Sequence, residues 1–126
     1  MRRWLWVWAP PVAEMILVFL VQTVPNLQIP TGQVTSPDKQ LHVITYGVLS
    51  VLFMRALADA RWAGLTWLRA FQAWGFAAAY GLFDEVHQRF VPGRSGSIGD
   101  WLADVAGAAV SVLVLCAVRV RRSREV

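Results

Sequence analysis

Two stretches decide the fold class of this chain: residues 73–83, AWGFAAAYGLF, and residues 105–118, VAGAAVSVLVLCAV. A surface helix of a soluble protein carries a polar stripe that recurs about every 3.6 residues. Both stretches are instead apolar around most of the helical circumference, so as helices they need lipid or a large protein core around them. With 126 residues, the chain is too short to enclose such helices in its own interior.

The composition of the whole chain points the same way. Hydrophobic residues make up 56% and charged residues 16%, against roughly 45–50% and about 25% in an average soluble domain. The single cysteine, Cys116, excludes a disulfide framework within the chain. We therefore predict a membrane protein, with a soluble four-helix bundle as the weaker alternative.

Four apolar segments recur along the chain, at residues 4–24, 41–57, 65–83 and 101–118. A bilayer core of about 30 Å requires about 20 helical residues, and each segment reaches that length once its polar ends are included. We predict one all-α domain over residues 1–126, a polytopic four-transmembrane-helix bundle. The first segment is expected to be a retained helix, and Pro10 and Pro11 mark either a kink or its true start.

The basic residues predict the orientation of this bundle. Nine lie at one end of the segments (Arg2, Arg3, Arg55, Arg61, Arg69, Arg119, Arg121, Arg122 and Arg124) and three at the other (Lys39, Arg89 and Arg94). Cytoplasmic loops carry the excess of Arg and Lys, so both termini are expected in the cytoplasm. The basic C-terminal tail fits lipid phosphates, and no motif favours nucleic acid as a partner.

Polar residues gather at the predicted outer ends of the last three segments. They are Asp38, Lys39, His42 and Tyr46; Tyr80, Asp84, Glu85, His87, Gln88 and Arg89; and Arg94, Ser95, Ser97, Asp100 and Asp104. Spacings of three and four residues place each group on one helical face. Because ionisable groups are costly against lipid, the three faces are expected to point inward and to form a functional site.

Most of these residues also have a structural interpretation. Ser36 suits an N-cap, with Asp38 an acid that favours the same helix N-terminus, and Ser97 with Asp100 suits a capping box. His42 suits a hydrogen-bonded core histidine. Asp104 lies too deep to cap its helix, and the adjacent Asp84 and Glu85 need neutralising partners. We expect those partners to be Lys39, Arg89 and Arg94. The turn containing Arg94 and Ser95 would offer backbone N–H groups and a guanidinium to an anion.

The order and spacing of these residues resemble a known family. The three blocks are Asp38-Lys39-x-x-His42-x-x-x-Tyr46, Asp84-Glu85-x-x-Gln88-x-Phe90-x-Pro92-Gly93-Arg94 and Asp100-x-x-x-Asp104-x-x-Gly107. Together they resemble the VanZ-like family of small bacterial membrane proteins, over residues 38–107 and without the first segment. The family often has Asn where this chain has Asp104, so this carboxyl group should be protonated or paired with a cation.

The resemblance implies a multi-pass protein of the bacterial cytoplasmic (inner) membrane that acts in the cell envelope. The family's namesake is linked to resistance to the glycopeptide antibiotic teicoplanin, and the resemblance implies no particular reaction. Our first hypothesis is an outward-facing site that binds or modifies an envelope lipid or a lipid-linked glycan, with an effect on teicoplanin susceptibility.

Within this hypothesis each site residue has a role, while the question of whether the protein is an enzyme stays open. If there is catalysis, the catalytic residues would be Glu85, Asp84, His42 and Asp100. Glu85 or Asp84 would act as a general base, and His42 or His87 would shuttle protons. Substrate binding would then involve Asp38, Lys39, Tyr46, His87, Gln88, Arg94, Ser95 and Asp104.

The alternative is a non-catalytic membrane scaffold that binds a partner. We expect no cofactor. A metal site is a weaker interpretation, because Asp84-x-x-His87 lacks the second histidine of the H-E-x-x-H motif. Partners would be membrane lipids or a lipid-linked precursor, and a second copy of the chain or another membrane protein. Glu14 is expected to lie too deep for the outer site, at a helix interface or paired with Arg55 or Arg69.

Overall fold

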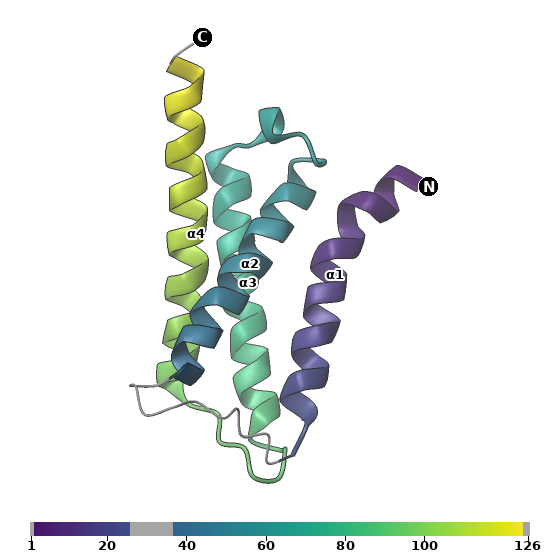
Figure 1. The fold of residues 1–126 in the computed structure, drawn as a ribbon, viewed down its shortest axis with the longest axis vertical. Helices are drawn as coiled ribbons and strands as arrows, with labels where there is room; N and C mark the ends of the chain where they lie inside the picture. The colour runs from purple at the N-terminus through teal and green to yellow at the C-terminus, as the bar shows by residue number, and fades with distance from the viewer. Residues whose placement is uncertain (1, 26–36, 125–126) are drawn as a thin grey trace.

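The structure is a computed structural model that describes residues 2–25 and 37–124, apart from the side chains of residues 37, 38, 63 and 120–124. It has four α-helices: α1 (Arg2–Thr23), α2 (Pro37–Leu57), α3 (Trp67–Gln88) and α4 (Ile98–Arg124). A short 3-10 helix, η1 (Trp62–Gly64), joins α2 to α3. Successive helices run in opposite directions, so both termini lie at one end of the bundle (Figure 1). The all-α prediction is confirmed.

The helices are long enough to cross a bilayer. At 1.5 Å per residue, the 22 residues of α1 extend about 33 Å. Among the described residues, three helical stretches also combine this length with an apolar composition: Arg2–Thr23, Lys39–Leu57 and Ile98–Arg119. The helix α3 is equally long but more polar, because it begins near Arg69 and continues beyond residue 83 through the acidic pair to Gln88. The prolines of α1 lie inside the helix, so they do not mark its start.

The helices α2, α3 and α4 form the compact part of the bundle, and α1 packs mainly on α2. Small residues allow the close approach. A Cβ atom on Gly107 of α4 would lie 2.2 Å from the carbonyl oxygen of Val43 in α2, and one on Gly81 of α3 would lie 2.8 Å from a carboxylate oxygen of Asp104. Small residues at helix interfaces are typical of membrane bundles, in which packing replaces the hydrophobic effect.

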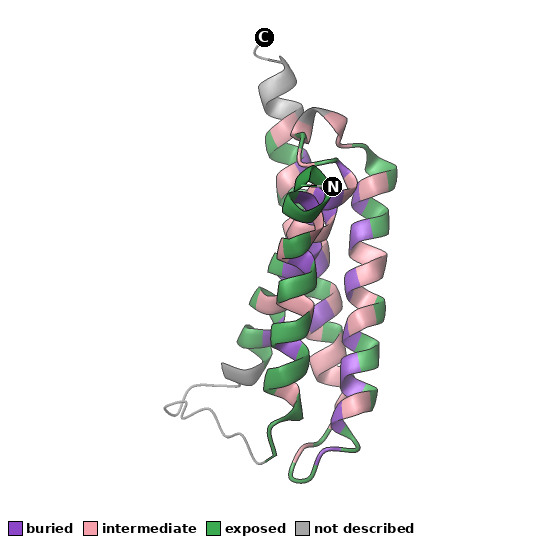
Figure 2. Ribbon diagram, turned by 90° about the vertical axis from the view of Figure 1, so that its right-hand side faces the viewer, coloured by how far each residue is buried: buried purple, intermediate pink, exposed green. Residues whose placement is uncertain are grey.

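The outer surface of the bundle is apolar. Figure 2 shows the buried residues on the inner faces of the helices and exposed residues along the outer face of α1. Large apolar side chains are exposed on every helix, among them Leu20, Ile44, Phe71 and Val110 at 58–65%. Soluble monomers rarely expose continuous apolar surfaces of this extent. This surface fits contact with lipid.

Side-chain caps mark the start of two of the helices. The hydroxyl of Thr66 accepts a hydrogen bond from the backbone N–H of Arg69 at the start of α3, and Ser97 accepts one from the N–H of Asp100 at the start of α4. Indole N–H groups then connect α3 and α4: Trp74 donates to the carbonyl of Val105, and Trp101 to that of Ala78. These bonds fix the height at which the two helices meet.

Candidate functional site

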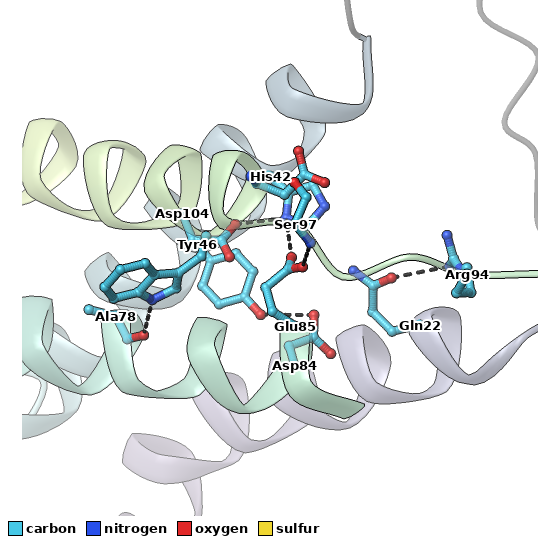
Figure 3. A network of polar contacts seen from close by, with 11 residues as sticks. Gln22, His42, Tyr46, Ala78, Asp84, Glu85, Arg94, Ser97 and Asp104 are labelled. Carbon is cyan, nitrogen blue, oxygen red and sulfur yellow. Dashed lines mark hydrogen bonds and ion pairs between the residues drawn. The ribbon is translucent and has the colours of Figure 1, made fainter. Parts of the chain in front are cut away.

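The predicted polar faces of α2, α3 and α4 converge at the end of the bundle opposite the termini (Figures 1 and 3). Six polar side chains there are buried: His42, Tyr46, Asp84, Glu85, Gln88 and Asp104. We call these six residues the polar cluster. Each side chain is less than 10% exposed, and that of Asp104 is fully buried. Burial of so many ionisable groups is costly unless each has a partner.

His42 and Asp104 form the closest pair in the polar cluster. The Nδ1 atom of His42 lies 2.8 Å from a carboxylate oxygen of Asp104, which connects α2 to α4. Gly81 makes room for this carboxylate, because any side chain at that position would collide with it. The imidazole therefore has one nitrogen held by a carboxylate and a fixed ring orientation.

Tyr46 and Asp84 connect α2 to α3 one turn away. The phenol of Tyr46 donates a hydrogen bond of 3.0 Å to one carboxylate oxygen of Asp84. Glu85 connects α3 to the start of α4, since one of its oxygens accepts a 2.7 Å hydrogen bond from the backbone N–H of Ser97. Figure 3 shows Glu85 between these groups, close to His42 and Ser97. A Cβ atom on Gly96 would lie 2.2 Å from the carbonyl oxygen of Glu85, so only glycine fits beside it.

Several atoms of the polar cluster have no hydrogen-bond partner within the protein. They include one carboxylate oxygen each of Asp84, Glu85 and Asp104, and the amide nitrogen of Gln88. Buried polar atoms are almost always satisfied, and the exceptions are concentrated at functional sites. The arrangement can therefore accept protons, cations or hydrogen-bond donors from a ligand.

The prediction that Lys39, Arg89 and Arg94 neutralise these carboxylates is wrong. Among the described residues, no Lys or Arg forms an ion pair with a carboxylate of the polar cluster, and only His42 does so. The guanidinium of Arg94 instead donates to Gln22 and to the carbonyl of Val21 at the end of α1. Lys39 and Arg89 are exposed. In the described part of the chain, the carboxyl groups of the polar cluster are therefore not neutralised by direct ion pairs with Lys or Arg.

The remaining predicted site residues take different positions. Asp100 is half-buried at the start of α4, and Ser95 is exposed in the turn before it. His87 points toward α1, where its ring stacks on Phe19 with centroids 4.7 Å apart. The side chain of Asp38 lies outside the described residues, as does Ser36, so the predicted cap of α2 is not described.

Sequence reasoning missed a groove between α1 and α2. Its volume is about 270 Å³, and it is lined by Glu14, Leu17, Val18, Val21, Gln22, Leu41, His42, Thr45 and Tyr46. Glu14 therefore borders the same groove as two members of the polar cluster, although its depth predicted otherwise. Among the described residues, Glu14 forms no ion pair. Arg69, which was one of its two expected partners, donates instead to the carbonyl of Gly64. The sequence did contain a signal for this groove, because Glu14 and Gln22 are polar residues in an otherwise apolar helix.

The sequence profile of the VanZ/LLP1 family matches residues 8–119. The chain belongs to the VanZ/LLP1 family. The match includes most of α1, so it extends beyond residues 38–107, which carry the recognised motifs. Nothing among curated proteins or solved structures matches the chain. Together with three strongly apolar helices, membership of this family makes the chain a membrane protein.

Proposed function

We propose that this VanZ/LLP1 protein crosses the bacterial cytoplasmic membrane four times, with both termini in the cytoplasm. The course of the chain supports the fourth crossing: α3 leads from the end of α2 back to the start of α4, and it packs against both along their length (Figure 1). The basic residues support the orientation, because Arg3, Arg55, Arg69 and Arg119 belong to the helix ends near the termini. The polar cluster then lies toward the outer leaflet.

We further propose that the polar cluster and the adjacent groove bind an envelope lipid or a lipid-linked glycan. One observation carries this proposal: the groove between α1 and α2 has walls of Leu17, Val18, Val21 and Leu41, and it reaches His42 and Tyr46. An amphiphile with an apolar chain and a polar headgroup matches this lining. Ligand sites in proteins combine such apolar walls with a few polar groups that orient the ligand.

Arg94 supports an anionic headgroup. Its guanidinium donates to Gln22, which lines the groove, and its Nε atom is buried without a hydrogen-bond partner in the protein. A guanidinium with an unused donor at the edge of an apolar groove suits a phosphate or carboxylate. Arg94 would therefore hold the charge of the headgroup while the groove holds the chain.

Modification of the bound headgroup is the second half of the proposal. The pairing of His42 with Asp104 gives the imidazole the orientation that general bases have when a carboxylate fixes one ring nitrogen. The unpartnered oxygen of Glu85 lies 4.0 Å from the same imidazole nitrogen. These two groups would transfer protons to and from a headgroup that Arg94 positions. Altered envelope lipids would then change susceptibility to teicoplanin.

The competing function is a scaffold without lipid chemistry. Its supporting observation is that His42–Asp104, Tyr46–Asp84 and Glu85–Ser97 connect α2, α3 and α4 at one level. Such a network locks helices together whether or not a ligand is present. The scaffold would present the turn before α4 to a partner protein.

Photo-crosslinking separates the two functions. A photoreactive amino acid replaces Val21 in the groove, and in a control replaces Val114, which is 55% exposed on α4. For lipid binding, the Val21 position should capture one class of anionic lipid or lipid-linked glycan, while the Val114 position captures lipids in proportion to their abundance. Arg94→Ala should remove this enrichment. Identical lipid profiles at both positions would favour the scaffold.

A further inference from the structure

Three potential metal ligands from three different helices meet at the polar cluster. His42 of α2, Glu85 of α3 and Asp100 of α4 each place one ligand atom within 4.8 Å of the other two. Ligand atoms bound to one cation at about 2.0–2.2 Å lie at most about 4.4 Å apart, so small side-chain movements would bring these three atoms around a single cation. No two of these residues lie in one short motif, so only the packing of the helices brings them together.

The charge of this region favours a cation. The carboxylates of Asp84, Glu85, Asp100 and Asp104 converge there, and in the described part of the chain none forms an ion pair with Lys or Arg. Arg94, the nearest candidate by sequence, is held by Gln22 and Val21 instead. Buried like charges repel strongly at low dielectric, and a divalent cation would offset two of them.

An independent observation concerns the free oxygen of Glu85. This side chain is 4% exposed, and the backbone N–H of Ser97 holds one of its oxygens at 2.7 Å. The other oxygen has no hydrogen-bond partner and lies 4.0 Å from Nδ1 of the His42 ring. Glu85 is thus a buried carboxylate that is fixed through one oxygen and directs the other toward the cluster.

Asp104 fixes the orientation of the His42 ring. Its carboxylate holds Nδ1 of His42 at 2.8 Å, so Nε2 is the nitrogen left for a ligand. Histidines that bind metals commonly have their second nitrogen bonded to a carboxylate in this way, which fixes both tautomer and ring orientation.

We propose that His42, Glu85 and Asp100 bind one divalent transition-metal cation, such as Zn²⁺ or Mn²⁺, with Asp104 as the outer partner of His42. One imidazole and two carboxylates suit these cations, since imidazole favours Zn²⁺ and carboxylates suit Mn²⁺. Three protein ligands leave coordination positions open, as in catalytic rather than structural sites. A phosphate or water could occupy them. Metal binding itself does not depend on the proposed lipid function.

The test is metal binding by the purified full chain in detergent, without an affinity tag. After treatment with a chelator, the protein is titrated calorimetrically with ZnCl₂ and with MnCl₂, and bound metal is counted by elemental analysis. We expect one cation per chain. His42→Ala, Glu85→Gln and Asp100→Asn should each abolish this binding, and Asp104→Asn should weaken it about 10–100-fold.

The matched control is His87→Ala, which removes the other histidine of the chain, stacked on Phe19 outside the cluster. It should bind metal like the unchanged protein. Should His42→Ala fail to fold, Asp100→Asn replaces it, because Asp100 is only half-buried. Substitution with Co²⁺ gives a second readout, a visible absorption band that Asp100→Asn loses and His87→Ala keeps. No stoichiometric binding of either cation, or binding that Asp100→Asn and Glu85→Gln leave intact, would overturn the proposal.

Discussion

The imidazole of His42 and the carboxylate of Asp104 lie 2.8 Å apart in the buried end of the bundle, and they join helices α2 and α4. Both side chains are nearly or fully buried, at 7% and 0% exposure. Loss of one partner would leave the other buried without its hydrogen bond. The pair thus connects the stability of the bundle to the chemistry of the site.

Two replacements of Asp104 should separate the contribution of its hydrogen bond to stability from that of its charge. Asp104→Asn keeps an oxygen that can accept from His42, so we expect a small loss of stability. Asp104→Leu leaves His42 unpaired and should cost about 1–3 kcal/mol. Chemical unfolding in detergent, followed by circular dichroism, measures both. Equal destabilisation by the two variants would contradict this account of the pair.

Gly107 is predicted to be the most sensitive glycine at the contact between α2 and α4. Gly107→Ala would place a Cβ atom 2.2 Å from the carbonyl oxygen of Val43, so the helices must separate. We expect a loss of at least about 1–3 kcal/mol, as for other overpacked cores. The measurement is the unfolding midpoint of the purified protein in one detergent.

Gly75 provides the matched control for this substitution. It also lies inside a helix, but a Cβ atom there meets nothing within 4 Å. Gly75→Ala should therefore be neutral or stabilising by about 0.5–1 kcal/mol, because glycine is unfavourable in a helix interior. If both alanine variants behaved alike, close packing at Gly107 would not be the cause.

Filling the groove should impair the proposed lipid binding without unfolding the bundle. Leu17→Trp adds bulk to the lining between α1 and α2, whereas Leu20→Trp adds it on the exposed outer face of α1. Only the first should reduce lipid capture in the photo-crosslinking assay and change teicoplanin susceptibility. The amount of folded protein in the membrane serves as the reference for both variants. Equal effects of the two substitutions would exclude a specific role for the groove.

The proposed orientation can be tested with single cysteines. Cys116 is buried and is first replaced by alanine. In that background, Ser95→Cys in the turn before α4 should react with a membrane-impermeant maleimide in intact cells. Asp59→Cys, between α2 and α3, should react only after lysis. Both positions are exposed, so accessibility within the protein does not bias the comparison. The reverse pattern would show that the termini face outward.

Much of the candidate site could be predicted from local sequence. Spacings of four residues placed His42 with Tyr46 and Asp100 with Asp104, because side chains four apart share one face of a helix. The burial cost of ionisable groups then predicted that these faces turn inward, as observed for His42, Tyr46 and Asp104. Partners on other helices could not be predicted in this way. Arg94 was expected near the carboxylates, yet it bonds to Gln22 of α1, a residue far from it in sequence.

The sequence by itself determined that the chain is helical, suits a membrane and carries five of its eight acidic residues at one end. These properties follow from hydropathy and helical periodicity, which depend only on neighbouring residues. Only the tertiary structure decided that His42, Glu85 and Asp100 meet and that Glu14 borders the groove. It also decided that, among the side chains that the structure describes, no Lys or Arg forms an ion pair with the polar cluster. Such contacts depend on how each helix is rotated about its axis and where it crosses its neighbours. In this bundle, the close approaches at Gly81 and Gly107 set the rotation of the helices and the points at which they cross.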